Sequence, residues 1–133
     1  MDIQSSYRKI IEIMKNILEE IAARTRERIA KEKSCISVSE LENRIQEVNK
    51  NARQKITFLQ ALQKDGMSYI CEVKKASPSK GLIAPDFPYL AIAKEYEQAG
   101  ASAISCLTEP FYFQGADQYL REISAAVQIP VRR

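Results

Sequence analysis

The residues best suited to chemistry in this sequence of 133 residues are an acid and an amine two positions apart, Glu72 and Lys74. Side chains two positions apart on a β-strand project from the same face, and this pair ends an otherwise apolar run. Burial of either charge is costly unless the charge is paired or serves a function. The pair therefore has two interpretations. It is a catalytic pair whose lysine binds an anion or delivers a proton, or it is a structural ion pair.

Two loop segments are further candidates for a binding site. The loop that follows the pair could hydrogen-bond a carboxylate or a phosphate, although its composition is also that of an ordinary polar loop. Its polar side chains are Lys75, Ser77, Ser79 and Lys80. The aromatic run 111–113 (FYF) could form the wall of a pocket for a planar ring, or it could cap the hydrophobic core.

The composition excludes several classes of protein. With 45% hydrophobic residues and a net charge of +3, the chain is not wholly disordered. The absence of histidine excludes histidine-based triads and histidine-ligated metals. Three cysteines cannot form a closed set of disulfides, and their spacing matches no local metal motif. The basic stretch 24–33 is interrupted by acids, which favours a solvated helix face over a nucleic-acid site.

The sequence also indicates where the protein is found. No run approaches the roughly 18 apolar residues of a membrane-spanning helix. The segment 1–15 is punctuated by charges and lacks the apolar stretch of a secretory signal peptide. We therefore expect a cytoplasmic protein that binds neither membrane nor nucleic acid.

The first half of the chain, residues 1–65, contains neither glycine nor proline. Apolar residues recur there at helical spacing, which predicts a long helix over about residues 4–33. Ser37 and Glu40 form a capping box that predicts the start of a second helix, and a short third helix is expected around residues 58–62. We interpret residues 1–65 as an N-terminal helical extension.

The second half, residues 66–133, holds all four glycines and all five prolines and alternates between strand and helix patterns. This order predicts a βαβαβ segment with parallel strands and helical crossovers. The turn after the first strand lacks a glycine-rich nucleotide-binding fingerprint, which leaves a (β/α)8 barrel of about 250 residues as the architecture. The chain would supply only the start of such a barrel. The predicted segments are strands at 67–74, 103–107 and 129–131, helices at 88–99 and 116–127, and loops at 76–87 and 108–115.

Several motifs resemble one known family. The run 70–81 (ICEVKKASPSKG) closely resembles the first-strand motif of indole-3-glycerol phosphate synthases, and the run 99–109 (AGASAISCLTE) is similar to their second strand. The run 112–115 (YFQG) resembles the loop that follows that strand. The run 17–21 (ILEEI), with the basic helix after it, is similar to the helical extension that precedes the barrel in this family.

The resemblance implies a (β/α)8, or TIM, barrel lyase of tryptophan biosynthesis that uses neither metal nor cofactor. Its substrate would be 1-(2-carboxyphenylamino)-1-deoxyribulose 5-phosphate, which the family cyclises, decarboxylates and dehydrates. By this resemblance, Glu72 orients the catalytic lysine, and Lys74 contacts anionic groups of the substrate and serves as a proton donor. Ser77 and Pro78 would belong to the loop that contacts the substrate, and Phe113 would form an aromatic wall beside its anthranilate ring.

The resemblance also implies a departure at the third strand. The family typically reads IPVLRKDF there, and its lysine is the main general acid, whereas this sequence reads IPVRR over residues 129–133. We therefore expect the N-terminal portion of a synthase, inactive as this chain alone. Two alternatives stay open. One is a non-catalytic barrel fragment that self-associates through exposed strand edges. The other is a related phosphate-binding barrel such as phosphoribosylanthranilate isomerase, against which the helical extension and the loop motif count.

Overall fold

The computed structural model describes residues 3–51 and 56–133, and the chain divides into two compact units, Met1–Arg53 and Gln54–Arg133. The first unit holds the helices α1 (Ile3–Cys35) and α2 (Val38–Asn51), which confirms the two long helices predicted from sequence. Ser37 precedes α2, and its Oγ accepts a hydrogen bond of 3.2 Å from the amide nitrogen of Glu40, as expected of a helix cap. No helix in the described ranges is long and apolar enough to cross a membrane.

The basic stretch of α1 is a solvated helix face. Arg24 pairs with Glu20 and Arg28 pairs with Glu32, in both cases four residues apart along the helix. Near the junction with α2, apolar side chains line a pocket of about 280 Å³. Its lining residues are Ile29, Glu32, Lys33, Ile36, Val38 and Leu41.

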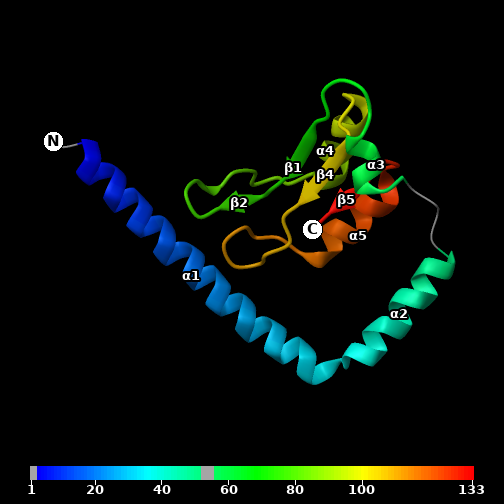
Figure 1. The fold of residues 1–133 in the computed structure, drawn as a ribbon, viewed down its shortest axis with the longest axis horizontal. Helices are drawn as coiled ribbons and strands as arrows, with labels where there is room; N and C mark the ends of the chain where they lie inside the picture. Colours follow the sequence, from blue (N-terminus) through cyan, green and yellow to red (C-terminus); the bar gives the residue numbers. More distant parts are fainter. Residues whose placement is uncertain (1–2, 52–55) are drawn as a thin grey trace. The chain divides into compact units, whose positions relative to one another are not determined.

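The second unit is built on a parallel sheet (Figure 1). Its strands β1 (Ile70–Val73), β4 (Ala103–Cys106) and β5 (Val131–Arg132) lie in the order β1-β4-β5. The helices α4 (Tyr89–Gln98) and α5 (Asp117–Ala126) connect successive strands. The predicted βαβαβ order with parallel pairing is confirmed, and the described strands do not close into a barrel.

Both crossover helices pack on one face of this sheet. Ala93 of α4 and Ile123 of α5 share a buried cluster with strand residues. The full cluster is Val73, Ala93, Ile104, Cys106, Ile123 and Val127. Because strand side chains alternate between faces, Glu72 and Ser105 project from the opposite face of the sheet.

The turn that ends α4 is a glycine cap. Gly100 has a φ of +91°, its amide donates to the carbonyl of Glu97, and the amide of Ala101 donates to the carbonyl of Tyr96. These two bonds form a Schellman motif, which satisfies carbonyl groups at the end of the helix. The motif turns the chain directly into β4.

The predicted loop over residues 76–87 is wrong in part, because it contains a short antiparallel hairpin. Its strands are β2 (Ala76–Ser77) and β3 (Gly81–Leu82). Gly81 has a φ of +64°, a conformation that favours glycine and lets the chain reverse within a few residues. The carbonyl of Lys75 accepts hydrogen bonds from the amides of Ile83 and Ala84, which closes the hairpin onto the end of β1.

The short third helix, α3 (Phe58–Leu62), is present where it was predicted and lies in the second unit. Thr57 caps it, and Thr57 and Gln60 form a reciprocal capping box. The amino-acid composition changes near Gly66. The assignment of residues 1–65 to a helical extension and of residues 66–133 to a barrel segment stays a prediction.

Candidate active site

Glu72 and Lys74 lie at the carboxyl end of β1. Oε1 of Glu72 is 2.7 Å from Nζ of Lys74, and the two side chains are 44% and 33% exposed. Val73, between them, is buried in the core beneath the crossover helices, so the pair projects from the free face of the sheet. The structure forms an ion pair between them and leaves both side chains partly exposed.

The strand register extends this face into a row of polar residues. Glu72 pairs with Ser105 of β4, and Ser105 pairs with Arg132 of β5. Neighbouring strands are about 4.8 Å apart, so an acid, a hydroxyl and a guanidinium group are carried within about 10 Å. The guanidinium carbon of Arg132 lies 5.8 Å from the ring centroid of Phe58 on α3, a cation–π contact. Ser105 was not predicted as a site residue, although it is a polar residue inside an apolar strand.

Arg133 ties the end of β4 to the start of α5. Its Nε donates a hydrogen bond of 2.8 Å to Oγ1 of Thr108, and its Nη2 lies 3.0 Å from Oδ1 of Asp117. Thr108 is buried, so this contact holds the carboxyl end of β4 in place. The first residue positions of the loop after β4 are therefore held by this contact.

The two loops expected to contact a substrate meet in the structure. The amide of Ala76 donates a hydrogen bond of 3.2 Å to the carbonyl of Phe113, and Figure 1 shows the β2–β3 hairpin beside the loop that follows β4. Ser77 is buried, and its Oγ accepts a hydrogen bond from the amide of Lys80. Pro78 is exposed at the turn of the hairpin.

The aromatic run does not cap the core. Phe111 is 57% exposed, Tyr112 and Phe113 are half-buried, and none of the three belongs to the buried cluster. The alternative, a wall beside a ligand, stays a prediction for Phe113.

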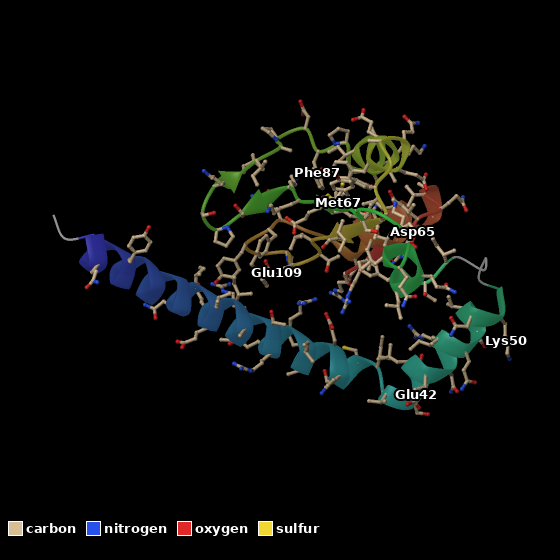
Figure 2. The ribbon with its side chains drawn as sticks, turned by 45° about the horizontal axis from the view of Figure 1, so that its top comes forward. Glu42, Lys50, Asp65, Met67, Phe87 and Glu109 are labelled. Carbon is tan, nitrogen blue, oxygen red and sulfur yellow. The ribbon has the colours of Figure 1, made fainter. Side chains whose placement is uncertain are left out.

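A carboxylate that the sequence analysis did not single out organises this aromatic loop. Glu109, labelled in Figure 2, accepts hydrogen bonds from the amides of Phe111, Tyr112 and Phe113 at 3.1, 2.7 and 3.2 Å. The available signal was an acid directly before a proline and a short aromatic run. That pattern is too common to identify such a role by itself.

The three cysteines are free thiols. Cys106 is buried, and burial raises the pKa of its thiol. Cys71 is half-buried and Cys35 is exposed.

Comparison with known proteins places this site in a family. The family model described as indole-3-glycerol phosphate synthase matches residues 18–133, most of the chain. The chain belongs to the indole-3-glycerol phosphate synthase family. The resemblance inferred from the motifs is therefore confirmed, and the open parallel sheet is part of a TIM-barrel fold.

Curated relatives carry the same name. The chain is 50% identical over 117 residues to the indole-3-glycerol phosphate synthase of Lacticaseibacillus paracasei and 48% identical over 118 residues to that of Ruminiclostridium cellulolyticum. It is 50% identical over 117 residues to the synthase of Endomicrobium trichonymphae. Each match covers 88% of this chain, and the chain spans only 44–45% of the length of these relatives.

Proposed function

We propose that the whole protein is an indole-3-glycerol phosphate synthase. It would convert 1-(2-carboxyphenylamino)-1-deoxyribulose 5-phosphate into indole-3-glycerol phosphate, carbon dioxide and water, without metal or cofactor. The observation that carries the proposal is the accessible pair of Glu72 and Lys74, 2.7 Å apart at the carboxyl end of the first strand. TIM-barrel enzymes build their active sites at that end of the strands.

The proposed roles follow from the chemistry of each side chain. The ammonium group of Lys74 would contact anionic groups of the substrate and donate a proton as the ring closes, and Glu72 would orient it. The hydroxyl of Ser77 accepts a bond from its own loop, which leaves its proton free to donate to a substrate oxygen. Pro78 would contact the substrate beside it, and the ring of Phe113 would pack against the anthranilate ring.

The test is a synthase assay that follows the fluorescence of indole-glycerol phosphate. We expect turnover by the whole protein and none by the 133-residue chain alone. The chain alone has an open sheet and lacks the third-strand lysine that serves the family as its main acid. Absence of turnover by the whole protein would overturn the proposed activity, and turnover by the chain alone would overturn its predicted inactivity.

Self-association of the chain is a second candidate. The strands β1 and β5 form the edges of the described sheet, and unpaired edges are templates for pairing with another copy. Next to the β1 edge, Tyr69 is 57% exposed and Ile70 is 50% exposed. Light scattering of the 133-residue chain at micromolar concentration is expected to show dimers or larger species, and a clean monomer would contradict this.

We also propose that the protein works in the cytoplasm. Its three cysteines are free thiols, as is usual for proteins of a reducing compartment. Fractionation of cells that produce the whole protein, followed by immunoblotting, tests this location. Recovery outside the cytoplasmic fraction would contradict it.

A further inference from the structure

The carboxylate of Glu109 is directed into its own loop. Oε1 accepts a hydrogen bond from the amide of Phe111, and Oε2 accepts hydrogen bonds from the amides of Tyr112 and Phe113. The carbonyl of Glu109 accepts a further bond of 2.8 Å from the amide of Gly115. One residue therefore binds the backbone of nearly the whole loop that follows β4.

The same hydrogen bonds also compensate the negative charge of the Glu109 carboxylate. Bonds from N–H groups to a carboxylate are roughly twice as strong as neutral ones, and three of them satisfy the oxygens without a cation. In the described part of the chain, no lysine or arginine forms an ion pair with this carboxylate. An acid held in this way does not turn its charge towards an anionic ligand at the neighbouring strand ends.

The loop that Glu109 holds is the one that carries Phe113. Its backbone is joined to the start of β2 by the bond from the amide of Ala76 to the carbonyl of Phe113. The ring of Phe113 can serve as a wall only if this backbone keeps one conformation, because its direction depends on the backbone angles of its own residue.

We propose that Glu109 is a positioning residue, which fixes the backbone of residues 111–113 and so the orientation of the Phe113 ring beside the substrate. The inference rests on the proposed function, in which that ring packs against the anthranilate ring. The Phe113 side chain forms no bond to the substrate and transfers no proton, so we expect its contact to contribute mainly to substrate binding. Its loss therefore raises KM and leaves kcat nearly unchanged.

The kinetic test uses the whole protein with Glu109→Ala, Phe113→Leu and the double variant, and Glu95→Ala on the exposed face of α4 as the control. We expect Glu109→Ala to raise KM about tenfold, the change for a loss of about 1.4 kcal/mol of binding, with kcat within about twofold. If Glu109 acts through Phe113, the double variant matches Phe113→Leu alone. An unchanged KM, an equal fall in kcat, or additive effects would overturn the proposal.

A second measurement does not depend on turnover. Amide hydrogen exchange is expected to speed up at residues 111–113 in Glu109→Ala and to stay unchanged at the β4 residues 103–106. Faster exchange in β4 as well would show a general structural role and overturn the proposal. If the alanine variant does not fold, Glu109→Gln keeps one acceptor oxygen and should raise KM about threefold, and an unchanged KM would again contradict the inference. Lack of turnover by the unaltered protein would instead overturn the proposed function, and the exchange result would stand separately.

Discussion

The amide nitrogen of Ala76 donates a hydrogen bond to the carbonyl oxygen of Phe113, 3.2 Å away. This bond joins the loop that follows β1 to the loop that follows β4, although the two residues lie far apart in the sequence. Since the bond is between backbone groups, changes in the Phe113 side chain leave it intact. The bond therefore holds the loop that carries Ser77 beside the loop that carries Phe113.

The ion pair of Glu72 and Lys74 is expected to matter for activity more than for stability. Lys74→Met should lower the kcat of the whole protein by about 10²–10⁴-fold, the usual contribution of a positioned proton donor. Glu72→Gln should also lower kcat, because it removes the charge that orients Lys74.

Stability serves as the control for that prediction. Both side chains are partly exposed, so either change should alter the free energy of unfolding by less than about 1 kcal/mol. Lys94→Met, at an exposed lysine of α4, should leave both quantities unchanged. Steady-state kinetics together with thermal unfolding separate these effects, and full activity in Lys74→Met would contradict the assigned role.

The contact between Tyr89 of α4 and Glu122 of α5 is expected to make stability depend on pH. The Tyr89 hydroxyl donates a hydrogen bond to Oε2 of Glu122. This bond lowers the pKa of Glu122 below its ordinary value of 4.5 and raises that of Tyr89 above 10.0. The contribution from Glu122 is therefore present in full above pH 4.5 and is lost as the pH falls through the lower pKa of the folded state.

Thermal unfolding of Tyr89→Phe tests this dependence. Its Tm should lie below that of the unaltered protein near neutral pH, and the gap should narrow in acid as Glu122 is protonated. Tyr96→Phe is the matched control, because the Tyr96 hydroxyl donates to the backbone carbonyl of Glu72, which does not titrate. The prediction would be contradicted if the difference in Tm from the unaltered protein changed equally with pH in both variants.

Glu97 is expected to stabilise the connection into the third strand. Its Oε1 accepts hydrogen bonds from the amides of Gln128 and Ile129 at 2.6 and 3.0 Å. Glu97→Ala leaves these amides without that acceptor and should lower the free energy of unfolding by roughly 1–3 kcal/mol. Glu95→Ala, at an exposed position of the same helix, should have little effect. Urea unfolding of both variants measures the difference, and equal midpoints would show that the contact contributes nothing.

At the end of the aromatic loop, we expect position 114 to tolerate glycine and position 115 to require it. A Cβ on Gly115 would lie 2.4 Å from the carbonyl oxygen of Leu107, so Gly115→Ala forces the backbone apart and should destabilise the protein by about 1–3 kcal/mol. Gln114 has a φ of +49°, which glycine adopts more easily, so Gln114→Gly should be neutral or stabilising. Thermal unfolding should give Gly115→Ala a lower Tm than the unaltered protein. The Tm of Gln114→Gly should be equal to that of the unaltered protein or higher. A lower Tm for Gln114→Gly together with an unchanged Tm for Gly115→Ala would contradict the prediction.

The candidate site could be predicted from sequence only where its parts are neighbours in the chain. Glu72 and Lys74 share a face because alternate residues of a strand do so, and the ion pair follows from that spacing. The role of Glu109 could not be predicted in this way. An acid four residues before Phe113 meets its amides only when the intervening loop folds back, and many sequences place an acid there without such a loop.

The sequence by itself determined the helices, the three parallel strands and the glycine turn at Gly100, because periodic apolar spacing and glycine conformation are properties of short segments. It did not determine the β2–β3 hairpin, whose pairing depends on how the chain reverses at Gly81. Only the tertiary structure decided which distant groups meet, such as Glu97 with Ile129, 32 residues further along the chain. Such contacts depend on strand register and helix packing, which arise when the crossover helices bury their apolar faces on the sheet and which no short segment encodes.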